Sequence, residues 1–286
     1  MYGLTTRGPG AVLASEAADL DRRNEEFWDE LCGTGFARQL GLEGRDQATL
    51  DAFDRAYLAF YPYLLGYVDR FAVGGHWVLE VGLGYGTLGQ QIVQRGARYH
   101  GLDIAAGPVQ MMRHRLAMLG VGGEERIVQG SAAAMPFENG TFDFVYSIGC
   151  LHHTGALAQS IDEVRRVLAP GGWAVVMLYH ADSARQLLKV RIPAVAARWR
   201  GRAGPTQAET ARLYDADSSG ATAPHTDFVS RTRVRYLFRQ FAELLIDTRN
   251  FDDVRIRGRT LIPRMRVLGS PLERWLGLDL YIVAQR

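Results

Sequence analysis

Short apolar runs alternate with helical periodicities through the middle of the chain. Five such runs predict buried strands, at 76–81, 99–103, 126–129, 142–148 and 173–179. Between them apolar residues recur every three or four positions, as Leu157, Ile161, Val164 and Leu168 do, which is typical of a helix with one buried face. Because strands alternate with helices of this length, residues 73–180 are predicted to form a parallel, doubly wound α/β core.

The segments on either side of this core have other patterns. Residues 1–20 contain Gly and Pro and are predicted to be a flexible N-terminus, whereas 21–72 form a helical cap. In the cap, four large residues fall at helical spacing and share one face: Phe53, Tyr57, Phe60 and Leu64. That face either covers the core of the next domain or forms a lid over a substrate pocket.

After residue 180 the regular alternation stops. Residues 181–240 are rich in Arg, Gly, Ala and Ser and are predicted to be an inserted helical lid between the fifth and sixth strands. Residues 241–286 supply two more strands, 244–250 and 278–284, as antiparallel neighbours at the sheet edge. The complete prediction is a seven-stranded, mostly parallel sheet with an N-terminal helical cap and an inserted lid.

A glycine cluster follows the first predicted strand. Gly82, Gly84 and Gly86 form a G-x-G-x-G turn, which lets a ligand approach the main chain without interference from side chains. Asp103 ends the second strand about 20 residues later, the spacing at which a carboxylate accepts hydrogen bonds from ribose hydroxyls. The pattern predicts a nucleoside site and leaves open whether the ligand is a dinucleotide.

Four segments, in order along the chain, resemble the motifs of class I S-adenosylmethionine-dependent methyltransferases. Residues 78–86 are similar to E/D-x-G-x-G-x-G, and residues 130–137 to G-D-A-x-x-L-P-F. Residues 142–153 are similar to F-D-x-V followed by L-H-H, and residues 166–172 match R-V-L-x-P-G-G. The resemblance covers about a third of the chain and implies S-adenosylmethionine as the cofactor.

The resemblance assigns roles by position around that cofactor. Three glycines would pass beside its methionine and ribose portions, Gly82, Gly84 and Gly86. Glu80 would hold the glycine loop and the methionine amino group. Two residues would offer main-chain groups near the sulfonium end, Ile148 and Gly149.

The adenosine half of the cofactor is assigned in the same way. Asp103 would bind the ribose hydroxyls, Ile104 would pack on adenine, and Ser131 and Ala132 would face the adenine edge. Ser131 departs from the family, which has an aspartate there to accept a hydrogen bond from the adenine amino group. Serine is shorter and neutral, so that contact is either mediated by water or lost.

The candidate catalytic residues are histidines. Methyl transfer needs a base only if the acceptor must lose a proton. His152 and His153 follow the fourth strand, and His225 lies in a turn at 223–228 within the insertion. Each is a candidate base or acceptor-orienting group. The alternatives are that His152 and His153 shape the pocket wall or cap a helix, and that Thr226 or Asp227 caps a helix beginning near residue 230.

Composition narrows the possible partners. The formal charge is only +2, which gives no case for nucleic acid. The two cysteines, Cys32 and Cys150, predict neither a disulfide framework nor a thiolate metal site, and no metal is expected because residues 148–150 lack the acids of metal-dependent members. The N-terminal residues lack the apolar core of a signal peptide, so a cytoplasmic location is expected.

One stretch is strongly basic. Residues 185–202 contain six basic residues and no acid, and they carry an apolar stripe of Leu188, Ile192, Val195 and Trp199. This stretch is interpreted as a lid or homodimer helix covering the pocket. The alternatives are contact with a membrane or a lipid acceptor, and contact with nucleic acid.

The predicted function is methyl transfer from S-adenosylmethionine to oxygen or nitrogen of a small-molecule acceptor of the specialised-metabolite type. The enzymatic alternative is methylation of a lipid or quinone at a membrane surface. Two further classes stay open, a nicotinamide-dependent oxidoreductase and a non-catalytic cofactor-binding regulator.

Overall fold

The computed structural model describes residues 9–31, 36–37, 40–42, 44–217, 219–256 and 259–286. Its centre is a seven-stranded sheet in the order β3-β2-β1-β4-β5-β9-β6. Its strands are β1 (Trp77–Val81), β2 (Arg98–Asp103), β3 (Ile127–Gln129), β4 (Phe142–Ile148), β5 (Leu168–Tyr179), β6 (Glu243–Arg249) and β9 (Asp279–Gln285).

The first five strands pair in parallel, and β9 is antiparallel to both β5 and β6. The predicted seven-stranded, mostly parallel sheet is therefore confirmed, including the two antiparallel neighbours at its edge. The strand order reverses between β1 and β4, so the crevice at their carboxyl ends is the switch point at which ligands bind in such sheets.

Helices cover both faces of the sheet, as expected for a doubly wound fold. On one face lie α4 (Leu64–Asp69), α5 (Thr87–Gln94) and α6 (Ala106–Leu119), which pack with Val78 of β1. On the other lie α7 (Leu157–Val167) and α11 (Arg231–Leu237), which pack with Leu79 and Val81. Successive residues of a strand face opposite sides, so β1 is buried on both.

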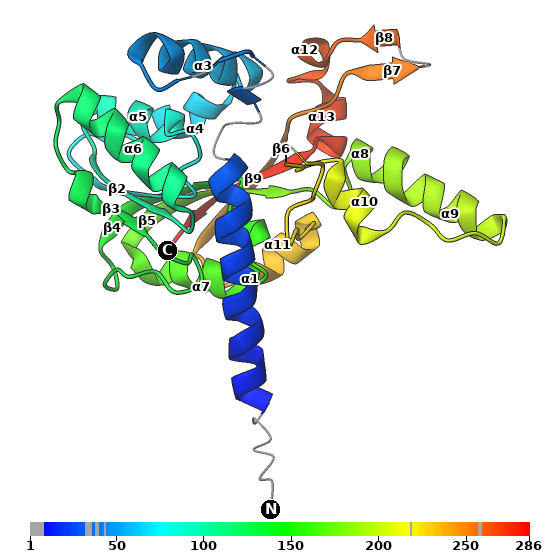
Figure 1. Ribbon diagram of the computed structural model, residues 1–286, viewed down its shortest axis with the longest axis horizontal. Coiled ribbons are helices and arrows are strands. Elements are labelled where there is room, and N and C mark those ends of the chain that lie inside the picture. The colour runs from blue at the N-terminus through cyan, green and yellow to red at the C-terminus, as the bar shows by residue number, and fades with distance from the viewer. Residues whose placement is uncertain (1–8, 32–35, 38–39, 43, 218, 257–258) are drawn as a thin grey trace, which may run out of the picture.

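Two helices of the N-terminal region flank the crevice. Helix α1 (Pro9–Leu31) extends well beyond the body at its N-terminal end, and its C-terminal half crosses the sheet edge (Figure 1). Residues 9–20 of the segment predicted to be a flexible N-terminus are helical, and residues 1–8 lie outside the described part. Helix α3 (Gln47–Phe60) is capped at its N-terminus by Asp46, whose side chain accepts a hydrogen bond from Thr49 N.

The residues of the predicted aromatic face of α3 differ in burial. Phe53 is buried and its ring lies 4.1 Å from that of Tyr85 in the glycine turn, and Tyr57 packs in the same cluster. Phe60 at the end of the helix is 40% exposed. Phe53 and Tyr57 therefore cover the core, whereas Phe60 is turned away from it.

The insertion between β5 and β6 has two parts. Its first part is α8 (Ala184–Gln186), η3 (Leu187–Arg191) and α9 (Ile192–Trp199), which project from the body (Figure 1). After α10 (Gln207–Arg212), residues 213–217 and 219–229 return to the sheet, where Val229 N donates to Tyr179 O and Asp227 N donates to His152 O. This second part and the base of the first, at Arg185 and Lys189, lie near the strand ends.

The apolar stripe of the projecting part does not cover the pocket. Leu188, Ile192, Val195 and Trp199 are 62%, 52%, 58% and 88% exposed. The helix is continuous through Pro193 because a wide π-helical turn, η3, precedes it and accommodates the missing N–H. The interpretation of this stretch as a lid is therefore corrected.

A second insertion is absent from the sequence-based prediction. A hairpin of β7 (Val254–Ile256) and β8 (Arg259–Ile262), followed by α12 (Arg264–Val267) and α13 (Pro271–Leu276), separates β6 from β9. Its strands are short, and the charged residues of this segment obscure the alternation of apolar and polar positions that would predict them. Within the described residues, no helix is both long and apolar enough to cross a bilayer.

Candidate functional site

A cavity opens at the carboxyl ends of β1, β2 and β4. It holds about 880 Å³ of space including its mouth to solvent. Its lining contains eight residues that the sequence assigned to the cofactor: Gly82, Gly84, Asp103, Ile104, Ser131, Ala132, Ile148 and Gly149. The structure thus brings together residues spread over 68 positions of the chain, between 82 and 149. We call this space the donor cavity.

The glycine turn has the backbone conformation that requires glycine. The φ angles of Gly82, Gly84 and Gly86 are +85°, +50° and +78°, a region that other residues rarely adopt. A Cβ built on Gly84 would meet no atom within 4 Å, because that position faces the open cavity. A Cβ on Gly86 would lie 2.8 Å from Cδ of Arg115, so Gly86 is required by packing within the protein.

Arg115 of α6 fixes the turn from behind. Its Nε donates to Tyr85 O at 2.7 Å, and its buried guanidinium pairs with Asp54 of α3 at 2.8 Å and donates to Gln90 at 2.7 Å. The Thr87 hydroxyl also donates to Asp54. Sequence reasoning missed this network, since an Arg and an Asp 61 positions apart carry no local signal.

Asp103 lies at the end of β2 with its carboxylate in the donor cavity. Its two oxygens accept hydrogen bonds from Leu83 N at 2.7 Å and Ala105 N at 2.9 Å. Burial raises its pKa to about 6, while these backbone donors act in the opposite direction. The backbone N–H groups of Gly84 and Ile104 act on the same carboxylate, so a ribose hydroxyl would bind beside four backbone donors.

Glu80 lies on the other side of the turn and does not line the donor cavity. It borders a smaller adjoining cavity that shares Gly82, Gly84 and Ile148 with the first. The Tyr99 hydroxyl donates to Glu80 Oε2, and burial raises the pKa of Glu80 to about 8. A ligand amino group can reach Glu80 only from this adjoining space, where the charge of an ammonium would favour the ionised carboxylate.

Helix α1 closes the donor cavity on the side of Ser131 and Ala132. Three residues on one of its faces line the cavity: Asp21, Asn24 and Trp28. Asn24 Nδ2 donates to His153 O at 2.9 Å, which ties the helix to the segment after β4. The i, i+3, i+7 spacing of these residues was the available signal, but helical spacing alone does not show which cavity such a face covers.

Asp21 stands beside the residue that departs from the family motif. Partial burial raises the pKa of the Asp21 carboxylate, while the neighbouring Ser131 side chain acts to lower it. A carboxylate is therefore present beside Ser131, and it comes from α1.

His153 is the one of the three candidate histidines that lines the donor cavity. Its Nδ1 lies 2.9 Å from the carbonyl of His225, and its Nε2 lies 3.7 Å from Asp215 Oδ2. A ring nitrogen beside a carbonyl carries the hydrogen, so Nε2 has the lone pair. Burial lowers the pKa of His153, which keeps the ring neutral at neutral pH.

His152 and His225 lie outside this cavity. His152 is fully buried, and its ring packs 4.1 Å from that of Tyr179. The His225 side chain pairs with Asp227 at 3.2 Å, so only its main-chain carbonyl reaches His153. Helix α11 is capped by Ser230, which corrects the expectation that Thr226 or Asp227 would cap it.

Cys150 also lines the donor cavity and packs against the Gly82 main chain, where a Cβ would collide with it. Burial raises the pKa of its thiol, which makes the thiolate scarce at neutral pH. Cys32 lies outside the described residues. The described part of the chain has no cluster of three or more side chains of the metal-ligating types.

The fold, with a cavity at the carboxyl ends of its parallel strands, is of the class I methyltransferase type. Comparison with known proteins agrees: residues 79–176 match the family described as methyltransferase domain. A solved S-adenosylmethionine-dependent methyltransferase from Archaeoglobus fulgidus superposes with a TM-score of 0.51 at 14% identity, covering 79% of this chain and 93% of that one. At that identity the likeness concerns the fold.

Curated relatives match by sequence as well. A sterol 24-C-methyltransferase of Gibberella zeae is 33% identical over 143 residues, 48% of this chain and 37% of that protein. A dimethylglycine N-methyltransferase of Parasynechococcus marenigrum is 31% identical over 172 residues, 59% of each protein. The chain thus spans about a third to three-fifths of the length of these relatives. Residues 79–176 form a class I methyltransferase domain, whose methyl donor is S-adenosylmethionine.

Proposed function

We propose that the protein transfers a methyl group from S-adenosylmethionine to oxygen or nitrogen of a small-molecule acceptor. The main support for this proposal is the donor cavity, which Gly84 and Asp103 line and into which no side chain projects from Gly84. When bound, S-adenosylmethionine supplies an electrophilic methyl on a sulfonium that leaves as a neutral thioether. The protein then has mainly to align the acceptor and exclude water.

The residues around the cavity suit that ligand. Gly82 and Gly84 give a main-chain surface for the methionine and ribose portions, and Asp103 accepts hydrogen bonds from the ribose hydroxyls. The apolar side chain of Ile104 packs on the adenine ring. Asp21, positioned by Ser131, accepts from the adenine amino group. Helix α1 thereby closes over the bound nucleoside.

His153 is proposed as the base for a hydroxyl acceptor. As the acceptor oxygen bonds to the methyl carbon, its proton passes to His153 Nε2 and the methyl–sulfur electron pair stays on sulfur. The imidazolium that forms faces Asp215 at 3.7 Å, so its charge is stabilised. An amine with a free lone pair needs no base. His152 and His225 act on His153, the first by packing and the second through its carbonyl.

Calorimetric titration tests the proposal directly. S-adenosylhomocysteine is expected to bind with one site per chain, whereas NAD is not. Binding of NAD in place of S-adenosylhomocysteine would make the protein a nicotinamide-dependent oxidoreductase. Binding of S-adenosylmethionine with no methyl transfer to any member of a phenol, carboxylic acid and amine panel would favour a non-catalytic regulator and contradict the proposed activity.

If Asp21 supplies the carboxylate that binds adenine, an aspartate at position 131 should be able to replace it. Asp21→Ala should weaken S-adenosylhomocysteine binding roughly fivefold, the effect of losing about 1 kcal/mol of hydrogen bonding. Adding Ser131→Asp to that variant should restore the affinity, because it returns a carboxylate to the adenine edge. Asp19→Ala, on the same helix but paired with exposed arginines, is the control that should change nothing. The role of Asp21 is refuted if the double variant binds no better than Asp21→Ala.

A second candidate function is methylation of a lipid or quinone at a membrane surface. It is favoured by the exposed stripe on α9, with Trp199 at its end. Basic side chains flank the stripe, and three of them, Arg198, Arg200 and Arg202, have no ion-pair partner within the described residues. An apolar face beside unpaired cations is complementary to an anionic lipid surface.

Vesicle co-sedimentation tests this candidate. The protein should bind vesicles of phosphatidylglycerol and phosphatidylcholine and should not bind phosphatidylcholine alone. Trp199→Ser should reduce binding several-fold, while Trp275→Ser, at a comparably exposed tryptophan on α13, should not. Absence of binding to the anionic vesicles at low ionic strength would remove the membrane candidate and leave the soluble acceptor.

A further inference from the structure

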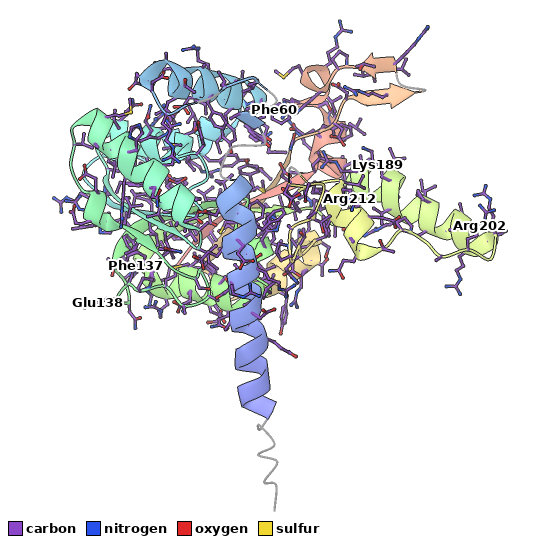
Figure 2. The ribbon with its side chains drawn as sticks, viewed as in Figure 1. Phe60, Phe137, Glu138, Lys189, Arg202 and Arg212 are labelled. Atoms are coloured by element: carbon purple, nitrogen blue, oxygen red, sulfur yellow. The ribbon has the colours of Figure 1, made fainter. Side chains whose placement is uncertain are left out.

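A second large cavity lies on the same edge of the sheet, at the ends of β5 and β9. It holds about 1,070 Å³ including its mouth. Its walls come from the end of α3, from the base of the projecting helix and from the loop after β6, and Figure 2 labels one residue from each of the first two, Phe60 and Lys189. None of the residues that line it lines the donor cavity.

The two cavities are nevertheless neighbours. Met177, which lines the second cavity, pairs with Ile148 of the donor cavity across the β4–β5 ladder. A Cβ built on Gly149 would lie 3.7 Å from Met177 Cε, so the methionine side chain is the wall between them. Tyr179 is a second link, because its hydroxyl donates to Asp215 at 3.2 Å. The second cavity therefore adjoins the end of the donor cavity assigned to the sulfonium.

The second cavity contains a buried cation without a carboxylate partner. The Arg264 side chain is 8% exposed, and its Nε and Nη2 donate to the neutral Asn250 Oδ1 at 3.2 and 2.9 Å. Among the described residues no carboxylate lies within 4.0 Å of the Arg264 guanidinium, whereas the nearby Arg185 pairs with Asp252. A buried and unpaired charge is costly, which points to an anionic partner supplied from outside the chain.

The buried acid of this cavity does not fill that role. Asp279 accepts a hydrogen bond from Asn250 Nδ2 at 2.8 Å, so the amide stands between it and Arg264. Burial raises the pKa of Asp279 to about 7, which leaves it only partly ionised at neutral pH. An arginine fork binds a carboxylate with two parallel hydrogen bonds, and Nη1 of Arg264 has no oxygen acceptor among the described residues.

Aromatic rings form another part of the wall. The Arg264 guanidinium carbon lies 3.9 Å from the centre of the Phe60 ring, and Tyr61 follows beside it. Across the cavity, the rings of Tyr179 and Tyr214 lie 4.8 Å apart. Aromatic walls beside a buried arginine that has no carboxylate partner favour a planar ring that bears an anionic group.

We propose that this second cavity is the acceptor site and that the acceptor is an aromatic carboxylate, held by Arg264 at one end and presented past Met177 to the donor cavity. The inference rests on the proposed methyltransferase function and adds the class of acceptor. It makes Arg264 a specificity-determining residue on α12, a helix far from the sequence motifs of the donor site.

Benzoate and benzamide are matched probes for this site, since they share size and shape and differ in charge. With the protein saturated in S-adenosylhomocysteine, ligand-observed NMR should give a dissociation constant for benzoate about tenfold lower than for benzamide, consistent with a charged hydrogen-bonded pair. In protein labelled at methionine methyl groups, benzoate should shift the Met177 resonance, assigned with Met177→Leu.

Arg264→Met should remove the preference for benzoate while keeping most of the side-chain volume. Arg255→Met is the control, because Arg255 lines the same cavity but is paired with Asp253 and should leave the preference intact. Thermal melting and the affinity for S-adenosylhomocysteine show whether each variant is folded.

The outcomes separate this inference from the function on which it rests. If the unaltered protein does not bind S-adenosylhomocysteine, the methyltransferase proposal is contradicted. Normal S-adenosylhomocysteine binding together with equal affinities for benzoate and benzamide would overturn the acceptor class. So would a Met177 resonance that benzoate does not move, or a benzoate preference that a folded Arg264→Met variant retains.

Discussion

Gly84→Leu is expected to abolish measurable binding of S-adenosylhomocysteine, weakening it by about 100-fold or more. At Gly84 a side chain would project into the donor cavity, since a Cβ there meets no protein atom within 4 Å. The new leucine would occupy the space in which the proposed ligand lies against the main chain. Calorimetric titration measures the loss.

The control for this variant must carry the same backbone strain. Gly171 also has a left-handed φ, +80° against +50° for Gly84, and a Cβ there likewise meets nothing within 4 Å. It lies in the turn before the buried part of β5, away from both cavities. Gly171→Leu should therefore lose similar stability, about 1–2 kcal/mol, and keep its affinity. If both variants bind equally well, the Gly84 main chain does not contact the nucleoside.

The core of the fold was predictable from the sequence because its signals are local. Buried parallel strands appear as continuous apolar runs such as 142–148, and left-handed turns demand glycine, as at Gly82. Asp103 could be placed because parallel strands end at one edge of a sheet. Each of these inferences depends on residues a few positions apart, or on one general rule of topology.

The remaining parts of the site depend on contacts between distant segments. Asp21 reaches Ser131 only because α1 crosses the cavity, and an amphipathic helix does not reveal which crevice it covers. The stripe at Trp199 predicted a helix correctly, but burial of its apolar face required a partner that the described residues do not supply. Arg264 gave no signal at all, since it is one of many arginines and its burial arises from an unpredicted hairpin and helix.

Asp103→Ala is expected to weaken S-adenosylhomocysteine binding roughly 10- to 100-fold, the range for losing two hydrogen bonds from sugar hydroxyls to a charged acceptor. The same substitution frees Leu83 N and Ala105 N, which the carboxylate now holds. Asp103→Asn keeps the shape and one acceptor oxygen, so it should show a smaller loss. An unaltered dissociation constant in the alanine variant would end the ribose assignment.

The pH dependence of binding separates the charge of Asp103 from its shape. With a pKa of about 6, the carboxyl is ionised at pH 7 and becomes protonated as the pH falls through 6, losing acceptor capacity. The dissociation constant for S-adenosylhomocysteine should therefore rise below pH 6, by up to tenfold per pH unit, and this rise should vanish in Asp103→Asn. Glu80, with a pKa of about 8, titrates at higher pH, so Glu80→Gln should leave the acid limb in place. If the dissociation constant of Asp103→Asn still rises below pH 6, the titration belongs to another group, because the amide cannot take up a proton in that range.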